Sequence, residues 1–401
     1  MNRPDLVALY RRTLASLSGE TLVRAALSGE PGLERGARVV ALGKAACAMA
    51  RGAALAVPGR LTGRVAAHVA ERLPPGLELF VGGHPLPDAG SEAAGRALLE
   101  TVEGAPEEEP VLFLVSGGGS AIAAAPAPGL GLADKIAATR VLLHSGAAID
   151  QVNAVRKHLS AIKGGQLGVR SRARRALALV LSDVPSGALD MVASGPTCPD
   201  PTTFAECLEL VRGLGVELPE AARARLERGA AVLVAETPKP GDARLARIEH
   251  RLLAGPSDLA PAAAAQAAAM GFAAQAAPTV FQGQLDRLFA ELLARAAPGG
   301  GPRLFALAGE PALRVPADAG SGGRMQHLAL LLARALAGRR FQALCAGSDG
   351  RDGPTAHAGA IVDGGTAARA RALGIDLDRA VERFDSAPAL ATLGAALPAF
   401  A

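Results

Sequence analysis

Aromatic residues are scarce in this chain of 401 residues. They make up 3% of the sequence, with no tryptophan and a single tyrosine, although 50% of the residues are hydrophobic. We therefore expect a core built from aliphatic side chains. Proteins that bind single-stranded nucleic acid stack the bases on aromatic platforms, so this composition argues against that mode of action.

Lysine is scarce too, with five lysines against 37 arginines. An ammonium is a compact point charge and a guanidinium is a planar fork, so each lysine that remains is informative. Lys44, Lys157 and Lys163 all lie in segments punctuated by glycine. The net charge of +4 is spread along the chain without a Lys/Arg-rich block, which favours anionic small substrates over a nucleic-acid partner.

Several diagnostic motifs are absent. The chain has no GxxxxGK[ST] motif and no GxGxxG motif, which excludes a P-loop enzyme and counts against a nicotinamide-binding site. Its four cysteines form no CxxC pair and have no spacing suited to zinc. Residues 1–18 show no secretory leader, so we expect reduced thiols and a cytoplasmic location. The longest apolar stretch, 259–280, is mainly alanine interrupted by proline and glutamine, and predicts a packed helix rather than a membrane span.

What the chain does contain is a recurring pattern: a short aliphatic run, then small or polar turn residues, then a helical segment. The runs lie at 38–42, 111–115, 176–181, 251–254, 304–307 and 342–345. Short apolar runs that alternate with helices are typical of parallel strands covered on both faces. We therefore predict a doubly wound α/β fold with a mostly parallel sheet.

The length predicts two domains. The segment ETPKPGD, residues 236–242, is typical of a linker, and PGGGP, residues 298–302, predicts a second break inside the later domain. We place an N-terminal α/β domain at 1–236 and a second, smaller α/β domain at 237–401.

Glycine, serine, aspartate and lysine collect where the aliphatic runs end, and ligands of open parallel sheets bind outside the carboxyl ends of the strands. Ser116–Ser120 places three glycines between two serines, a pattern that fits either an anion cradle of backbone amides or a tight strand–helix turn. Lys44 opens a helix after a strand and is either a partner of phosphoryl or carboxylate oxygens or an ordinary exposed lysine.

Residues 153–165 have the spacing of an amphipathic helix that stops at two glycines. Arg156, Ser160 and Lys163 would share one face of it, which is either functional or simply solvated. His84 and His158 are expected to be structural, because no serine or cysteine nucleophile accompanies them.

Three aspartates, Asp183, Asp349 and Asp352, lie at strand ends. Carboxylates there could hold Mg²⁺ or accept the proton of a substrate hydroxyl, and the alternative, preferred for Asp352, is a turn-forming residue. Arg324 follows a glycine pair and precedes a leucine-rich helix, so it is either a bidentate anion clamp or a surface arginine.

Taken together, these segments resemble the class II glycerate 2-kinases, whose C-terminal portion is called the MOFRL domain. The matching segments, in chain order, are ALGKA, GGHPLPDAGS, VSGGGSA, NAVRKHLSAIKGG, LSDVPSG, ASGPTCPDPTT, GGRMQHLAL and AGSDGRDGPTAHAGAIVD. They span residues 41–363 in the order that the family has them, and the ordered set is far more specific than any one segment.

The resemblance implies transfer of the γ-phosphoryl group of ATP to O2 of D-glycerate with Mg²⁺, at an active site in the cleft between two α/β domains. It implies Lys44 as the lysine of the substrate and phosphoryl group, Asp183 near the reacting hydroxyl and Arg324 as an anion clamp. The metal ligands that we expect are Asp183 and Asp349. The cofactor contacts that we expect are Ser116, Gly117, Gly118, Gly119, Ser120, Asn153, Lys157 and Asp349.

The chain departs from the family at residues 325–327, where Met-Gln-His replaces the usual Asn-Gln-Glu. By resemblance, these positions border the nucleotide or acceptor side of the site. Two other functions stay open: an NAD(P)H-dependent hydroxypyruvate reductase, against which the missing GxGxxG motif counts, and a divergent member that binds a small hydroxy acid or nucleotide with weak or no catalysis. The expected partners are small molecules, with no nucleic acid and no membrane, and the oligomeric state is left open, a homodimer included.

Overall fold

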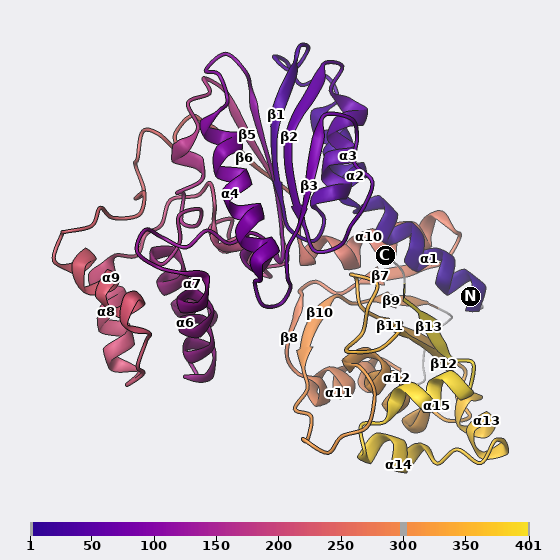
Figure 1. Ribbon diagram of the computed structural model, residues 1–401. Coiled ribbons are helices and arrows are strands. Elements are labelled where there is room, and N and C mark those ends of the chain that lie inside the picture. Colours follow the sequence, from indigo (N-terminus) through magenta and orange to yellow (C-terminus); the bar gives the residue numbers. More distant parts are fainter. Residues whose placement is uncertain (1–2, 297–302, 400–401) are drawn as a thin grey trace. The chain divides into compact units, whose positions relative to one another are not determined.

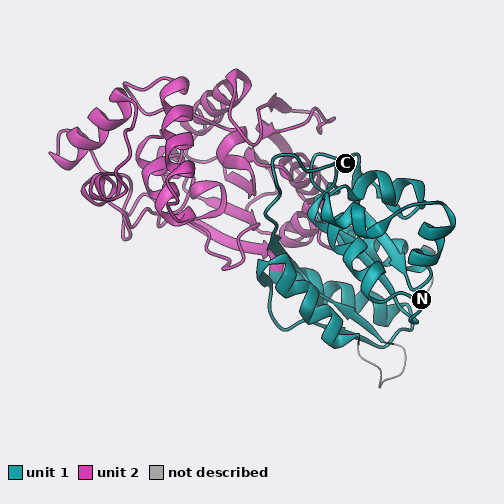
Figure 2. Cartoon of the chain, turned by 90° about the horizontal axis from the view of Figure 1, so that it is seen from below, with its two compact units in different colours: residues 1–15, 257–401 teal, residues 16–256 magenta. Residues whose placement is uncertain are grey.

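The computed structural model describes residues 3–296 and 303–399, so the break predicted at 298–302 lies outside the described residues. The chain forms two compact units, which Figure 2 colours separately. Unit 2 comprises residues 16–256, and unit 1 comprises residues 1–15 together with 257–401.

Unit 2 is built on a six-stranded sheet in which every strand pairing is parallel (Figure 1). The spatial order is β3-β2-β1-β4-β5-β6. The order reverses between β1 and β4, and such a switch point is where open α/β sheets bind ligands, outside the carboxyl ends of the strands. The strands are β1 (Gly36–Leu42), β2 (Arg60–Ala67), β3 (Leu77–Val81), β4 (Val111–Ser116), β5 (Ala176–Leu181) and β6 (Ile248–Ala254).

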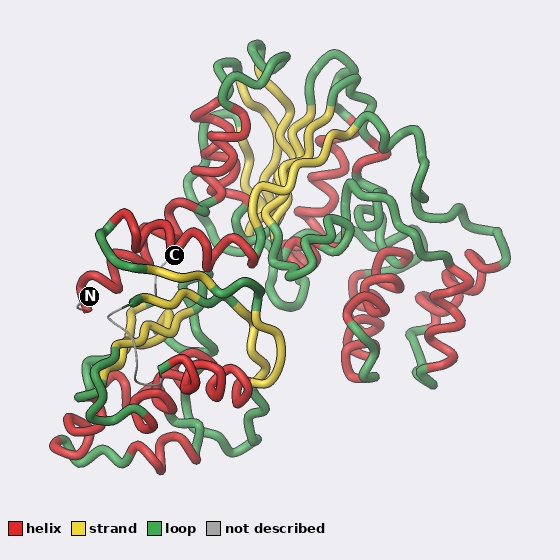
Figure 3. The backbone as a smooth tube through the Cα atoms, turned by 180° about the vertical axis from the view of Figure 1, so that it is seen from behind, coloured by secondary structure: helices red, strands yellow, loops and turns green. Residues whose placement is uncertain are grey.

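Both faces of this sheet are covered by helices, as Figure 3 shows. Along β4, Phe113 and Val115 belong to the core under α4 (Ala89–Glu103), whereas Leu112 and Leu114 belong to the core under α2 (Gly19–Leu27) and α3 (Ala46–Ala56). Side chains of a strand alternate between the two faces, so a sheet buried on both sides needs consecutive apolar residues. This explains the aliphatic runs and confirms the predicted α/β class with a parallel sheet.

Four further helices of unit 2 pack around a core of their own, which includes Leu142, Val155, Phe204 and Leu226. The helices are α6 (Leu132–His144), α7 (Ile149–His158), α8 (Phe204–Gly213) and α9 (Glu220–Ala230). Between β4 and α6 lies α5 (Gly119–Ile122), which is one turn long.

Unit 1 contains a three-stranded antiparallel sheet, β11-β12-β13, and two parallel strand pairs, β7 with β9 and β8 with β10. The largely buried helix α12 (Arg324–Ala335) lies at the centre of its main hydrophobic core. The strands are β7 (Ala274–Ala276), β8 (Phe281–Gln284), β9 (Leu304–Ala306), β10 (Gly309–Ala312), β11 (Gln342–Ala346), β12 (His357–Asp363) and β13 (Ala396–Pro398). The remaining helices are α1 (Arg3–Ser16), α10 (Pro256–Ala269), α11 (Leu285–Arg295), α13 (Thr366–Ala372), α14 (Leu377–Glu382) and α15 (Ser386–Thr392).

All six aliphatic runs form strands, but β11 does not run parallel to its neighbour. It pairs antiparallel with β12, which follows after the loop at residues 347–356. A parallel neighbour would need a longer crossover, usually through a helix. The alanine-rich stretch at 259–280 forms most of α10 and then β7. Over the described ranges, none of the helices combines the length and the apolar composition that crossing a membrane requires.

The helix predicted over 153–165 is shorter than its periodicity indicates. It begins at Ile149 and ends at His158. Beyond it, Ser160 forms an isolated antiparallel bridge with Pro126, and the amide of Ala161 donates to the carbonyl of Ala125 at 2.9 Å. This pairing with a distant segment overrides the local pattern, so Ser160 and Lys163 do not share a helix face with Arg156.

The segment predicted as a linker, 236–242, is bound into unit 2. The carboxylate of Glu236 accepts a hydrogen bond from the amide of Phe204 at 2.9 Å, and the hydroxyl of Thr237 donates to Asp200 at 2.9 Å. Strand β6 then follows within the same sheet. The compact units divide after residue 256, and the domain boundary near Thr237 stays a prediction.

Candidate functional site

The carboxyl ends of β1 and β4 meet at the switch point of the sheet. The amide of Lys44 donates to the carbonyl of Gly117 at 2.9 Å, and the hydroxyl of Ser116 accepts from the amide of Ala45 at 3.0 Å. Gly43 has a φ of +120°, and a Cβ on it would lie 2.3 Å from the hydroxyl oxygen of Ser116, so no other residue fits there. The turn that carries Lys44 is therefore fixed against the glycine loop at 116–120.

Two predicted residues and one unpredicted residue surround the glycines of this loop. A Cβ on Gly117 would lie 2.1 Å from Oδ2 of Asp183, which places that carboxylate directly against the loop backbone. A Cβ on Gly118 would lie 3.0 Å from Cγ of Lys44 and 3.3 Å from Cδ2 of His84. Asp183 and His84 are exposed and Lys44 is half-buried, so all three can be reached by a solute.

The loop offers backbone donors. Among the described residues, no main-chain carbonyl accepts a hydrogen bond from the amides of Gly117, Gly118, Gly119 or Ser120. Amides grouped in this way bind anionic oxygens. Because α5 is only one turn long, the helix dipole adds little, and the individual N–H groups carry the interaction.

The far end of the loop is joined to α7 by a chain of side-chain hydrogen bonds. The hydroxyls of Ser120 and Ser194 lie 2.7 Å apart, and Ser194 donates to Oδ1 of Asn153 at 3.1 Å. Ala193 and Ser194 have φ values of +51° and +60°, in the left-handed region that residues with a side chain rarely adopt. A strained turn held by its surroundings is typical of functional sites, and it brings Ser194 to the loop.

Lys157, a predicted cofactor contact, lies inside the protein, and its charge is balanced there. It is 3% exposed, and its Nζ lies 3.1 Å from Asp190 and 3.6 Å from Asp200. An ammonium with two carboxylate partners attracts a third anion less than an unpaired one does.

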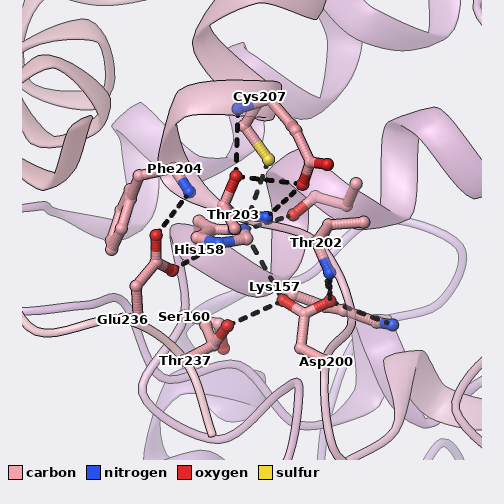
Figure 4. A network of polar contacts seen from close by, with 12 residues as sticks. Lys157, His158, Ser160, Asp200, Thr202, Thr203, Phe204, Cys207, Glu236 and Thr237 are labelled. Carbon is pink, nitrogen blue, oxygen red and sulfur yellow. Dashed lines mark hydrogen bonds and ion pairs between the residues drawn. The ribbon is translucent and has the colours of Figure 1, made fainter. Parts of the chain in front are cut away.

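Lys157 and Asp200 belong to a network that ties α7 to α8 and to the segment around residue 237 (Figure 4). The buried ring of His158 lies 2.9 Å from the carbonyl of Ala154 and 3.3 Å from Glu236, and it packs edge-on against Phe204 with the ring centroids 4.5 Å apart. Burial raises the pKa of the neighbouring Cys207 thiol to about 12, so it stays protonated. The structural role expected for His158 agrees with these contacts, and all four cysteines are free and buried.

The predicted residues of unit 1 cluster around the start of α12. Arg324 is the first residue of this helix, and its guanidinium donates to the carbonyl of Pro311 at 3.0 Å and lies 3.5 Å from Glu310. Asp352 caps the same helix, accepting from the amides of Met325 at 3.0 Å and Gln326 at 2.7 Å. Asp352 is thus a structural residue that joins the two glycine-rich segments of unit 1.

Asp349 lies exposed in the loop that follows β11, close to the only tyrosine of the chain. The hydroxyl of Tyr10, from α1, donates to the carbonyl of Gly347 at 2.5 Å. Burial raises the pKa of Tyr10, and the negative charge of Asp349 raises it further. Sequence reasoning missed Tyr10, because nothing in the pattern of α1 connects it to a loop more than 300 residues away.

The replaced positions 325 and 327 lie inside unit 1. His327 is 6% exposed and stacks on Phe384 with the ring centroids 4.8 Å apart, and Met325 packs against the main core of the unit. Burial lowers the pKa of His327, which keeps the ring neutral near neutral pH.

We expect His327→Glu to lower the free energy of unfolding by about 3–5 kcal/mol at neutral pH, because it buries a carboxylate in place of a neutral ring. Asp286 acts on position 327 more strongly than Arg334 does, so its repulsion of the new carboxylate outweighs the attraction of Arg334. Urea unfolding measures the change. His327→Phe, which keeps the stacked ring, is the matched control, and equal stability of the two variants would contradict the buried placement.

A surface hollow of about 370 Å³ also occurs in unit 2, lined in part by Arg38, Arg64, Glu78 and Glu100. Its arginines are already paired: Arg38 lies 2.8 Å from Glu109, and Arg64 lies 2.7 Å from Glu100 and 3.1 Å from Glu78. Balanced charges leave little attraction for an anionic substrate. The glycine loop is therefore the better candidate site.

Sequence reasoning identified Lys44, the loop and Asp183, which unit 2 brings together. The second group of predicted residues, Arg324 and Asp349, belongs to unit 1. Sequence reasoning did not identify His84 or Ser194 as neighbours of the loop. His84 lies in the segment GGHPLPD and Ser194 in the segment ASGPTC, and both segments end near the carboxyl edge of the sheet. These two segments were the signal in the sequence that could have indicated residues close to the loop.

Comparison with known proteins gives these two groups a context. Residues 5–227 match a family described as a domain of unknown function (DUF4147), and residues 303–400 match the MOFRL family. A D-glycerate 2-kinase of Thermotoga maritima is 36% identical over 329 residues, which cover 80% of this chain and 76% of that protein. A protein of Agrobacterium vitis provisionally named hydroxypyruvate reductase is 36% identical over 367 residues, covering 89% and 82% of the two chains.

The fold agrees with these relatives. The crystal structure of a glycerate kinase from Thermotoga maritima superposes on this chain with a TM-score of 0.84 at 33% sequence identity. The superposition covers 98% of this chain and 94% of the Thermotoga chain. Because one family match spans more than half of the chain, and because the relatives match over most of their own length, this chain belongs to the family of DUF4147 and MOFRL proteins that contains the glycerate 2-kinases.

Proposed function

We propose that the chain is a glycerate 2-kinase, which transfers the γ-phosphoryl group of ATP to O2 of D-glycerate. The observation that carries the proposal is the group formed by Lys44, the amides of 117–120 and the carboxylate of Asp183 at the switch point of the sheet. The names of the relatives supply the substrate.

Phosphoryl transfer depends mainly on positioning and on neutralising negative charge, so it needs cations and backbone donors more than a nucleophilic side chain. The loop amides would hold phosphate oxygens, and the ammonium of Lys44 would neutralise charge that develops on the transferred group. Asp183 would accept the proton of the attacking hydroxyl. Asn153 and Lys157 would support the loop from α7, and Arg324 would bind a further anionic group from unit 1.

In the proposed reaction, Mg²⁺ would bind together with the nucleotide. Over residues 3–296 and 303–399, no group of three or more His, Cys, Asp or Glu side chains is placed to hold a metal ion. Protein-bound Mg²⁺ commonly keeps several waters and uses one or two carboxylates plus the phosphates of the substrate. The exposed carboxylate of Asp183, with Asp349 as the second candidate, is consistent with that requirement.

With ATP and D-glycerate, the protein is expected to form 2-phosphoglycerate, which phosphorus NMR distinguishes from the 3-phospho isomer. A reaction without acceptor is the control for ATP hydrolysis. Formation of 3-phosphoglycerate would overturn the proposed position of transfer.

The second candidate is reduction of hydroxypyruvate, favoured by the name of the Agrobacterium relative and by a strand order that dinucleotide-binding folds also use. NADH consumption with hydroxypyruvate, in the absence of phosphoryl transfer to glycerate, would establish it instead. A cytoplasmic location stays part of the proposal, because free, buried thiols suit a reducing compartment.

A further inference from the structure

Three basic side chains gather behind the glycine loop of unit 2. Lys163 is 1% exposed, and its Nζ donates to the carbonyl of Ser120 at 3.0 Å. Lys135, on α6, is 3% exposed, and its Nζ donates to the carbonyl of Ala125 at 3.5 Å. Arg156, on α7, donates through Nη1 to Oδ1 of Asn153 at 3.4 Å.

Within the described residues, none of these three side chains has an acidic partner. Lys135, Arg156 and Lys163 form no ion pair there, and the charges that act on the two lysines belong to other members of the group. Burial lowers the pKa of Lys135 to about 7, with a further contribution from Arg156. Burial lowers the pKa of Lys163 as well, with Arg156 and Lys135 adding to the effect. Lys157 lies on the same helix as Arg156 and is as buried as Lys135, but it has two aspartate partners. The lack of a carboxylate partner therefore distinguishes this cluster from Lys157.

Arg156 is the member of the cluster that a solute can reach. Its side chain is half-buried, and its Nε, shielded from solvent, has no hydrogen-bond partner. Asn153, which orients it, also accepts from Ser194, and Ser194 contacts Ser120 of the loop. The guanidinium is therefore linked to the candidate phosphate loop through Asn153 and Ser194, and it has hydrogen-bonding capacity unused.

An arginine fork is suited to a planar or tetrahedral oxyanion, and a largely buried guanidinium without an acidic partner is costly until an anion neutralises it. We propose that Arg156, oriented by Asn153 and backed by Lys135 and Lys163, is an oxyanion-binding residue of unit 2. Its ligand is a negatively charged oxygen group of the reactants, either the carboxylate of the hydroxy acid or a phosphate of the nucleotide. The inference rests on the proposed function only for the identity of that anion.

The test measures binding by calorimetry on the full chain, separately for D-glycerate, ATP and inorganic phosphate. Arg156→Gln is expected to weaken binding of phosphate and of one reactant by about 10- to 100-fold, the range for losing a hydrogen bond to a charged group. Arg156→Lys keeps the charge but loses the planar guanidinium, so its affinity is expected to lie between those of wild type and Arg156→Gln. Arg223→Gln, on the exposed face of α9, is the matched control and is expected to bind like wild type.

Thermal unfolding without ligand separates this role from a structural one. Burial lowers the pKa of Arg156, so its charge destabilises the unliganded fold, and Arg156→Gln is expected to melt at the wild-type temperature or above. A lower melting temperature together with unchanged ligand affinity would show a structural arginine and overturn the proposal, as would equal affinity of Arg156→Gln and wild type for all three ligands.

The two reactants identify the source of the anion: selective loss of D-glycerate binding indicates the carboxylate, and selective loss of ATP binding indicates a phosphate. If Arg156-dependent binding occurs without phosphoryl transfer, the proposed function fails and this inference stands.

Discussion

Replacing Asp183 with asparagine is expected to lower kcat of glycerate phosphorylation by about 10²- to 10⁴-fold. The substitution preserves the shape of the side chain and removes the negative charge that would accept the hydroxyl proton. Asp183 is exposed and lies against the backbone of Gly117. Steady-state kinetics at saturating Mg²⁺ and ATP measure the change, and Asp150→Asn, an exposed position on α7, is the control.

A second variant, Gly117→Ala, tests the position of the same carboxylate without changing any charge. A methyl group on Gly117 would meet Oδ2 of Asp183 at 2.1 Å, so Gly117→Ala is expected to displace the carboxylate and lower kcat while all charges remain. If Asp183→Asn instead weakens the dependence on Mg²⁺ and keeps kcat at saturation, the carboxylate binds the metal and is not the proton acceptor.

Lys44→Ala is expected to remove about 2–4 kcal/mol of transition-state stabilisation, the scale for one preorganised electrostatic group. This corresponds to a fall in kcat/KM of about 30- to 1000-fold. The hydrogen bond from residue 44 to the carbonyl of Gly117 uses the main-chain amide, so it survives in the alanine variant and the turn should keep its shape. The melting temperature is accordingly expected to stay close to that of wild type.

Lys44→Arg provides the comparison, and it should recover little activity, because a planar fork does not replace a point charge at the same distance. A variant in which activity and melting temperature fall together would mark Lys44 as a structural residue of the turn.

Much of the candidate site could be predicted from the sequence, because its parts are local. The glycines of 117–119, the lysine after β1 and the aspartate after β5 each follow an aliphatic run, and the carboxyl ends of parallel strands share one edge. The residues that sequence reasoning missed, His84, Ser194 and Tyr10, reach their loops from elements that are distant in the chain. Spacing along a sequence carries no information on such contacts.

The sequence by itself determined the α/β class, because strands buried on both faces require continuous aliphatic runs, and those runs are visible without coordinates. It also predicted which segments would carry chemistry, through an ordered set of glycine-rich motifs. Tertiary structure alone decided where α7 ends, because pairing of residues 160–161 with 125–126 opposes the helical periodicity. It decided as well that Lys157 meets two aspartates while Arg156, one position away, donates to Asn153. Adjacent residues of a helix point in directions about 100° apart, so neighbours in sequence enter different surroundings, and only the packing of other elements determines what each of them meets.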